Sequence, residues 1–147
     1  KMITHKKISK TELPKLVAIS YEKDQELFDK YHQIPNTSFP EAVLSTLDII
    51  DDASKSFKLS YYKLIYKKQP IGYFVIFGEY LYSFAIGVNF RKKEVLSRWF
   101  ENVKSELPPH FKAILYENNT RAIKHLERQG MKIIDHDKET NIITLQN

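Results

Sequence analysis

The stretch Asn119-Thr-Arg-Ala-Ile-Lys-His-Leu-Glu-Arg-Gln-Gly-Met131 predicts a short amphipathic helix after a strand-like run. Asn119 is placed to cap the helix, because its side-chain oxygen can accept a hydrogen bond from a first-turn N–H group. Gly130 suits the left-handed residue that closes a helix. Ala122, Ile123 and Leu126 form a narrow apolar stripe between polar positions. On these features alone, the segment is an ordinary surface helix.

Outward from this helix, the hydrophobic pattern changes repeatedly between the helical and the strand period. The predicted order is strand, two helices, three strands, helix, strand, helix and two strands. The predicted strands are Met2–Ile8, Leu59–Lys67, Ile71–Phe77, Tyr80–Val88, Phe111–Tyr116, Lys132–Asp135 and Asn141–Leu145. The predicted helices are a first helix that Thr11 or Ser9 caps and that runs to about Tyr31, then Phe39–Ile50, Phe90–Leu107 and Asn119–Gln129.

Local start and stop signals support this order. Ser38-Phe39-Pro40-Glu41 is a capping box with proline in the first turn, and Asp51 and Asp52 mark where the helix is expected to fray. Lys68-Gln69-Pro70 is the predicted turn between the second and third strands. Gly78-Glu79 predicts a tight hairpin with glycine at the first position of a type II′ turn.

This order predicts a mixed α/β (α+β) sheet in a single domain over residues 1–147, with helices on both faces. Most neighbouring strands are expected to be antiparallel. Tyr80–Val88, the helix after it and Phe111–Tyr116 form a strand-helix-strand unit, whose strands run parallel through a right-handed crossover. In such a unit the helix begins at the carboxyl end of the first strand, where free N–H groups bind anions. The candidate anion site is Asn89–Leu96.

Composition excludes several classes of protein. The chain has 147 residues, is 42% hydrophobic and contains no cysteine, which excludes disulfide scaffolds, thiolate zinc sites and cysteine nucleophiles. No apolar run approaches the ~20 residues of a membrane span, and the region before Lys6 lacks an apolar signal core. We therefore expect a cytoplasmic protein without a membrane partner, starting naturally at Met2. The net charge of +5 would attract a phosphorylated cofactor or a nucleic acid alike.

The pattern Asn-x-x-Ala-Ile-x-x-Leu-Glu-x-x-Gly-Met within Asn119–Met131 resembles the last helix of the GNAT N-acetyltransferase superfamily. The predicted order of elements from Ile8 to Leu145 is also the order of that fold. The resemblance implies a GNAT-like fold, with acetyl-CoA as co-substrate and no metal. It further implies a small-molecule or protein amine as the acceptor, and a monomer or homodimer.

The resemblance also implies where coenzyme A would bind. The fourth strand, with Phe84, Ala85 and Ile86, would lend backbone groups to the pantetheine arm, and the next loop would hold the pyrophosphate. The last helix, with Asn119, Ala122 and Lys124, would complete the slot. The loop residues are Arg91, Lys92, Lys93, Glu94, Val95 and Leu96.

The loop departs from the family pattern Arg/Gln-x-x-Gly-x-Gly/Ala. Arg91 matches, but Glu94 and Leu96 replace the two glycines that let backbone N–H groups approach phosphate. Arg91, Lys92 and Lys93 supply positive charge that can meet the phosphates directly. The alternative is a solvated basic cluster, although cations at a helix N-terminus are mildly unfavourable without a nearby anion.

In the family, the substrate amine attacks the thioester, a base or water chain deprotonates the amine, and a tyrosine often protonates the leaving thiolate. The resemblance places that tyrosine at Leu126. Tyr116 is a candidate replacement, and Glu79 and Tyr80 lie near where some members keep a general base. The alternatives are a core or rim role for Tyr116 and a turn role for Glu79.

Other patterns are weaker. The five histidines show no metal-ligand spacing, and His136 is expected in an exposed turn. Aromatic and basic residues interleave between Tyr61 and Lys68, as in single-strand binders, but a half-buried hairpin gives the same pattern. Three hypotheses follow: an acyl-CoA-dependent N-acetyltransferase, a GNAT-shaped binding module that has lost catalysis, and, less favoured, a basic nucleic-acid binder.

Overall fold

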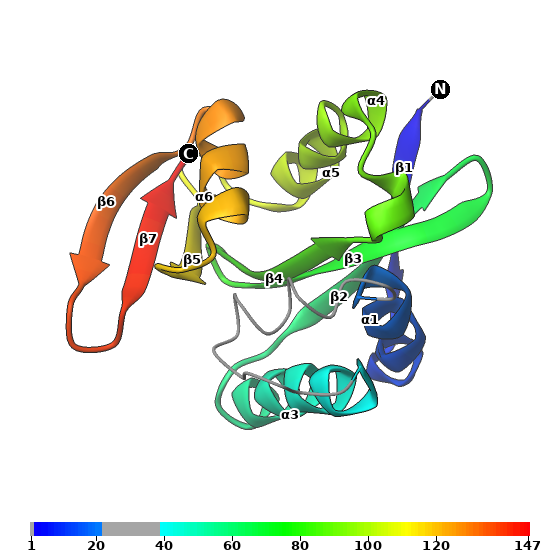
Figure 1. Cartoon of the computed structure of the whole chain (residues 1–147), viewed down its shortest axis with the longest axis horizontal. Helices are drawn as coiled ribbons and strands as arrows, with labels where there is room; N and C mark the ends of the chain where they lie inside the picture. The colour runs from blue at the N-terminus through cyan, green and yellow to red at the C-terminus, as the bar shows by residue number, and fades with distance from the viewer. Residues whose placement is uncertain (1, 22–38) are drawn as a thin grey trace.

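The computed structural model describes residues 2–21 and 39–147, with side chains described for 2–19 and 47–147. Its centre is a seven-stranded sheet in the order β1-β2-β3-β4-β5-β7-β6 (Figure 1). The strands are β1 (Ile3–Ile8), β2 (Ser60–Tyr66), β3 (Gln69–Phe77), β4 (Tyr80–Ile86), β5 (Lys112–Tyr116), β6 (Lys132–Asp137) and β7 (Ile142–Gln146). The helices are α1 (Leu13–Tyr21), α3 (Phe39–Ser56), α4 (Lys93–Leu96), α5 (Trp99–Glu106) and α6 (Thr120–Arg128).

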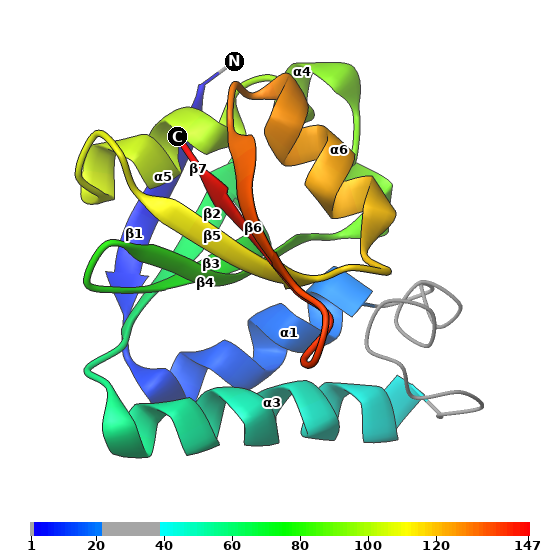
Figure 2. The same cartoon turned by 90° about the vertical axis from the view of Figure 1, so that its left-hand side faces the viewer.

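The predicted fold class is confirmed. Among the described strands only β4 and β5 are parallel, and all other neighbours are antiparallel. Helices α1 and α3 cover one face of the sheet, and α4, α5 and α6 cover the other (Figure 2). We call these the α1/α3 face and the α4–α6 face.

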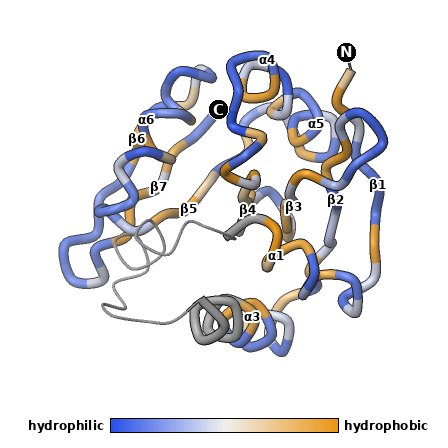
Figure 3. The backbone as a smooth tube through the Cα atoms, turned by 45° about the vertical axis from the view of Figure 1, so that its right-hand side comes forward, coloured by the Kyte–Doolittle hydropathy of each residue, from blue (hydrophilic) through white to orange (hydrophobic). Residues whose placement is uncertain are grey.

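Each face of the sheet has its own hydrophobic core, because β3 is buried on both sides. Tyr73 and Val75 pack with α1 on the α1/α3 face, whereas Phe74 packs with Trp99 and Phe100 on the α4–α6 face. In Figure 3, which colours the backbone by hydropathy, parts of β3, β5 and α1 are hydrophobic, as expected for elements that contribute to the cores.

The close approach of β3 and β4 requires a glycine at position 72. A Cβ atom added to Gly72 would lie 2.1 Å from the carbonyl oxygen of Ala85, which is backbone and has no side-chain freedom to move aside. A larger residue at this position would therefore push β4 away from β3.

Residues with positive φ form the turns of the β2–β3 and β3–β4 hairpins. Gly78 has φ 54°, as expected for glycine opening the β3–β4 turn. The predicted turn at Lys68-Gln69-Pro70 is wrong. Lys67 and Lys68 both have positive φ (52° and 64°) and form the turn alone, since two left-handed residues match the twist of the flanking strands. Gln69 and Pro70 already pair with β2.

The predicted single helix Phe90–Leu107 is also wrong. The chain makes a short 3-10 helix (Val88–Phe90), then α4, and after a break α5. At the break, Arg98 has φ −121° and its N–H group bonds to the carbonyl of Val95, three residues back instead of four.

Helix α3 continues to Ser56, beyond the predicted fraying point at Asp51 and Asp52. Contacts that the local pattern does not encode extend it: Asp51 forms an ion pair with Lys10, and Ile50 is buried against α1. The end of the first predicted helix beyond Tyr21 and the capping residue Ser38 lie outside the described residues.

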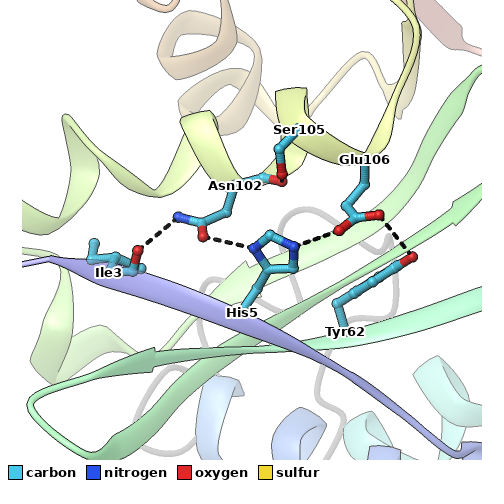
Figure 4. A network of polar contacts seen from close by, with 6 residues as sticks. All are labelled: Ile3, His5, Tyr62, Asn102, Ser105 and Glu106. Carbon is cyan, nitrogen blue, oxygen red and sulfur yellow. Dashed lines mark hydrogen bonds and ion pairs between the residues drawn. The ribbon is translucent and has the colours of Figure 1, made fainter.

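Helix α5 is fixed to β1 by a polar network (Figure 4). Asn102 Nδ2 donates to the carbonyl of Ile3 (3.3 Å), so its Oδ1 atom is turned to His5 Nδ1, 2.7 Å away. The other ring nitrogen of His5 lies 2.6 Å from a carboxylate oxygen of Glu106. Tyr62 on β2 donates to the second oxygen of that carboxylate (3.2 Å). The network holds the helix that follows the candidate anion loop.

Candidate functional site

The site begins where β4 and β5 separate. The two strands pair only through Tyr80 with Lys112 and Leu81 with Ala113. Strand β4 stays paired with β3 as far as Ile86, and β5 stays paired with β7 as far as Tyr116. The facing edges of β4 and β5 therefore have no strand partner beyond Leu81 and Ala113. Unpaired backbone groups at such a gap can bind an extended ligand.

A β-bulge in β4 lies at the start of this gap. Val75 pairs with Ser83 and Ile76 with Leu81, so Tyr82 is an extra residue in β4. A bulge interrupts the alternation of side chains. Tyr82 consequently packs on the α1/α3 face together with Ser83, whose hydroxyl lies 3.0 Å from that of Tyr73.

On the α4–α6 face, an aromatic layer connects β4 to α6. The ring of Phe84 stacks on Trp99, with 5.1 Å between ring centroids. Trp99 Nε1 donates to His125 Nε2 (2.7 Å), and Gln129 Nε2 donates to the carbonyl of Leu96 (3.0 Å). These bonds hold α6 beside α4 and α5, on the same side of the sheet as Phe84.

His125 is therefore a neutral acceptor. The indole N–H group can only donate, so His125 Nε2 must carry its lone pair toward Trp99. Burial, and next the positive charge of Arg128, lower the pKa of His125. Both observations indicate an uncharged imidazole between α5 and α6.

The candidate anion loop is basic but lacks a long helix behind it. Arg91 Nε donates to the carbonyl of Ile86 at the end of β4 (2.8 Å), which holds the side chain at the gap. Lys92 and Lys93 are exposed, whereas Val95 is buried in the core. Because α4 has four residues, its dipole is small, and the predicted anion site depends mainly on the basic side chains.

Glu94, the acidic residue of this loop, has positive charges and a tyrosine near it. The hydroxyl of Tyr66 is buried and makes no hydrogen bond within the described residues. Its proximity, and next the charges of Lys67 and Lys92, lower the pKa of Glu94. Tyr66 and Lys67 belong to the β2–β3 hairpin, and α6 lies on the other side of α4 from that turn (Figure 1). Glu94 therefore stays ionised, with positive charges from both the hairpin turn and its own loop nearby.

The structure confirms most of the features predicted for helix α6. Gly130 has φ 103°, Ile123 and Leu126 are buried, Ala122 packs against the core, and Lys124 is exposed. Asn119 is the N-cap residue, as predicted, but the predicted hydrogen bond is wrong, because its side chain makes no capping hydrogen bond. Its ψ of 58° departs from the extended conformation that a capping side chain uses. Leu126 is 0% exposed, so an apolar core residue occupies the position that the resemblance assigns to the acid.

The candidate catalytic residues lie at opposite ends of the β4–β5 pair: Glu79 and Tyr80 at the paired end, and Tyr116 at the open end. Glu79 pairs with Lys112 (3.1 Å) at the end where β4 and β5 are still hydrogen-bonded, and Lys112 lies over the ring of Tyr80. Tyr116, 42% exposed, lies at the open end of β5. It faces the α1/α3 side, since Ala113 and Leu115 face the other core.

Two residues that the sequence did not single out join Tyr116. Burial raises the pKa of Tyr82, and the charges of Tyr116 and then Asp52 act on its hydroxyl electrostatically and raise the pKa further. Asp52 is on α3, in the segment predicted to fray. No signal in the sequence marks Tyr82, because the bulge that turns it depends on the register with β3.

Other predicted features can be placed directly. Tyr61, Tyr62 and Tyr66 are buried, which confirms the half-buried hairpin and leaves these rings unavailable for stacking on bases. His136 lies in β6, not in a turn, and pairs with Glu117 (2.6 Å). In the part of the chain that the structure describes, no group of three or more His, Asp or Glu residues could hold a metal ion. Within the same residues, no helix is long and apolar enough to cross a membrane.

No protein-family model matches the chain, and no curated protein sequence matches it. Several solved structures do match it in fold. An acetyltransferase from Thermus thermophilus has a TM-score of 0.74 at 12% identity, covering 100% of this chain and 97% of that one. The apo form of YjaB from Escherichia coli has a TM-score of 0.67 at 18% identity, with 99% and 97% covered. Spermidine N-acetyltransferase from Vibrio cholerae, in complex with CoA and spermine, has a TM-score of 0.64 at 11% identity, with 99% and 95% covered.

These likenesses establish the fold, which is that of the GNAT acetyltransferases. The resemblance stated from the sequence is thereby confirmed at the level of the fold.

Proposed function

We propose that the protein is a single-domain N-acetyltransferase that transfers acetyl from acetyl-CoA to an amine. The observation that carries this proposal is the early end of the β4–β5 ladder, with the bulge at Tyr82 beside it. The fold shared with acetyltransferases supports it. Bound acetyl-CoA would supply an acetyl group already activated as a thioester.

The residues around the gap fit a phosphorylated, extended cofactor. The unpaired edge of β4 at Phe84, Ala85 and Ile86 offers backbone groups for an extended amide chain. Positive charges for the phosphates come from Arg91, Lys92, Lys93 and, on α6, Lys124. The charges of Lys67 and Lys92 near Glu94 offset part of its negative charge at this loop.

In the proposed reaction, the amine nitrogen attacks the carbonyl carbon, the C–S bond breaks, and the thiolate takes a proton. The proton that the amine loses goes to a base, for which Glu79 and Asp52 are the carboxylate candidates beside the aromatic residues. Tyr82 and Tyr116 are the candidate donors to the thiolate, and Tyr80 is a third. The raised pKa of Tyr82 keeps its proton available at neutral pH.

The test is calorimetric titration of the whole chain with acetyl-CoA, followed by thiol release with an amine panel that includes spermine and ribostamycin. We expect saturable binding and thiol release with at least one amine. An absence of binding heat at millimolar acetyl-CoA would contradict the proposal.

A second candidate is a GNAT-shaped binding module without catalysis. It is favoured by Leu126, which is fully buried and offers no proton to a thiolate. Such a module would bind acetyl-CoA in the titration and release no thiol with any amine. The two measurements therefore separate the candidates.

A further inference from the structure

Helix α5 is held on two sides by histidines, one on β1 and one on α6. The two ring nitrogens of His5 lie 2.7 Å from Asn102 Oδ1 and 2.6 Å from Glu106 Oε2, both on α5 (Figure 4). On the other side, His125 Nε2 lies 2.7 Å from the indole nitrogen of Trp99, the first residue of the same helix. A histidine ring carries one or two protons, so the protons that each contact requires decide when both contacts can form.

The contacts of His5 require a proton on both ring nitrogens. The carbonyl of Ile3 can only accept, so Asn102 donates to it with Nδ2 and presents its own carbonyl oxygen to His5 Nδ1. His5 Nδ1 must therefore carry a proton. A second proton lies between His5 Nε2 and the carboxylate of Glu106, and it belongs to the ring because imidazole is a stronger base than a carboxylate. The hydrogen bonds thus describe a positively charged ring.

The groups that face His5 from the neighbouring elements fit this state. Glu106 on α5 supplies the negative charge, and Tyr62 on β2 donates to its other oxygen at 3.2 Å. The rings of Tyr62 and Phe74 lie around the imidazole, with centroids at 5.6 and 5.7 Å. Lys7 shares this face of β1 by strand alternation, and it is exposed. Burial, and next the charge of Glu106, raise the pKa of Tyr62, so its hydroxyl keeps its proton well beyond neutral pH.

The contact of His125 requires the opposite state. The indole N–H group of Trp99 can only donate, so His125 Nε2 must be free of a proton. The two rings are also stacked, with 5.8 Å between their centroids. Burial, and next the positive charge of Arg128 on the same helix, lower the pKa of His125 and favour the neutral ring. Acidification would set two N–H groups against each other, whereas a rise in pH leaves this contact unchanged.

We infer that α5 is held on both sides only while His5 carries two ring protons and His125 carries one. Acidification opens the contact between α5 and α6, and a rise in pH opens the contact between α5 and β1. Helix α4, which carries the candidate anion loop, comes directly before α5, so the support of that loop changes with pH in both directions. The device is closed over an intermediate range of pH, and it does not depend on any reaction that the protein catalyses.

The direct test is NMR of the full chain without substitutions. Trp99 is the only tryptophan in the sequence, so its indole N–H group gives a single resonance. We expect this resonance to shift as acidification protonates His125. Long-range ¹H–¹⁵N spectra of ring-labelled histidine should show two protonated nitrogens for His5 and one for His125 at neutral pH. A singly protonated His5 at neutral pH, or an indole resonance that does not follow the titration of His125, would overturn the inference.

Amide hydrogen exchange measures whether the two contacts hold the helix. The protection factor of the Val103 amide in α5 should fall about tenfold on either side of the intermediate pH range, because one hydrogen bond of the helix to its neighbours is lost. The amide of Val75 in β3 should keep its protection over the same range. Equal falls for Val103 and Val75 would mean that the whole fold opens, which contradicts a device specific to α5.

Variants assign each fall in protection to its histidine. His125→Gln should abolish the fall on the acidic side, and His5→Gln the fall on the alkaline side, since a side-chain amide does not titrate. Tyr62→Phe should retain the alkaline fall, which separates the ring of His5 from the tyrosine hydroxyl. His110→Gln is the matched control, because His110 is exposed and lies outside both contacts, and it should retain both falls. An alkaline fall that persists in His5→Gln, or an acidic fall that persists in His125→Gln, would refute the assignment.

Discussion

At the scale of single residues, the most consequential feature is Leu126, at the position that the sequence resemblance assigns to the proton donor. A fully buried leucine cannot donate a proton, so an active enzyme needs a donor elsewhere. Tyr116 and Tyr82 lie on the α1/α3 face at the open end of the gap, whereas Tyr80 lies at the paired end. In the proposed transferase, activity therefore depends on which tyrosine reaches the leaving thiolate.

We predict that Tyr116→Phe lowers kcat about 100-fold and leaves the KM for acetyl-CoA nearly unchanged, because only proton transfer is lost. Steady-state thiol release measures both constants. Tyr61→Phe is the control, since Tyr61 is a buried tyrosine of the same face away from the gap. A larger loss with Glu79→Gln than with Tyr116→Phe would move the chemistry to the paired end of β4 and contradict the assignment.

A second prediction at this scale concerns pH and His125. The folded protein holds the pKa of His125 below its ordinary value of 6.5, so at pH values below that the unfolded chain binds more protons. The free energy of unfolding therefore falls as the pH drops through 6.5 toward the lowered pKa, and it does not depend on His125 at higher pH. A protonated ring would also set an N–H group against the indole N–H of Trp99.

His125→Gln keeps an acceptor for Trp99 and removes the titration. We expect urea unfolding of this variant to lose part of the decline in stability on acidification. His110→Gln, at an exposed histidine, should retain the decline of the original chain. Identical pH profiles for His125→Gln and the original chain would contradict the interpretation.

At the scale of elements, period and turn chemistry predict what is local. Alternation along the strands and the turn signals predicted the neighbours β2–β3, β3–β4 and the parallel pair β4–β5, and Gly78 and Gly130 adopt the conformations that their positions require. The pairing of β1 with β2 and of β5 with β7 was not predicted, because these strands are distant in the sequence. The bulge at Tyr82 and the break at Arg98 were not predictable, because each depends on hydrogen bonds to a partner that the local pattern does not identify. The candidate site was less predictable than the elements, since only tertiary packing places Tyr82 and Asp52 on the same face of the sheet.

The contribution of the polar network between α5 and β1 to stability can be measured with single variants. Glu106→Ala removes the acceptor of both His5 and Tyr62, and we predict a loss of about 1–2 kcal/mol in the free energy of unfolding. Glu101→Ala removes a carboxylate from the same helix whose partner is Lys104, at 3.4 Å in an exposed pair, and should cost no more than about 0.5 kcal/mol. Chemical denaturation measures both, and equal losses would show that the network does not fix the helix.

At the scale of the whole molecule, basic residues gather at the start of α4 and on α6. A net charge of +5 attracts any anion, so affinity for coenzyme A alone would not show a local site. The distinction requires variants that change the net charge equally at different places.

We predict that Lys92→Gln with Lys93→Gln weakens coenzyme A binding about tenfold or more and flattens its salt dependence, because two charges that meet the phosphates are lost. Pantetheine, which has no phosphate, should bind the variant and the original chain alike. Lys6→Gln with Lys7→Gln makes the same change of net charge on exposed positions of β1 and should have little effect. Calorimetry at low and high salt provides the comparison. Equal weakening by both double variants would mean that the overall charge, and not the start of α4, attracts the cofactor.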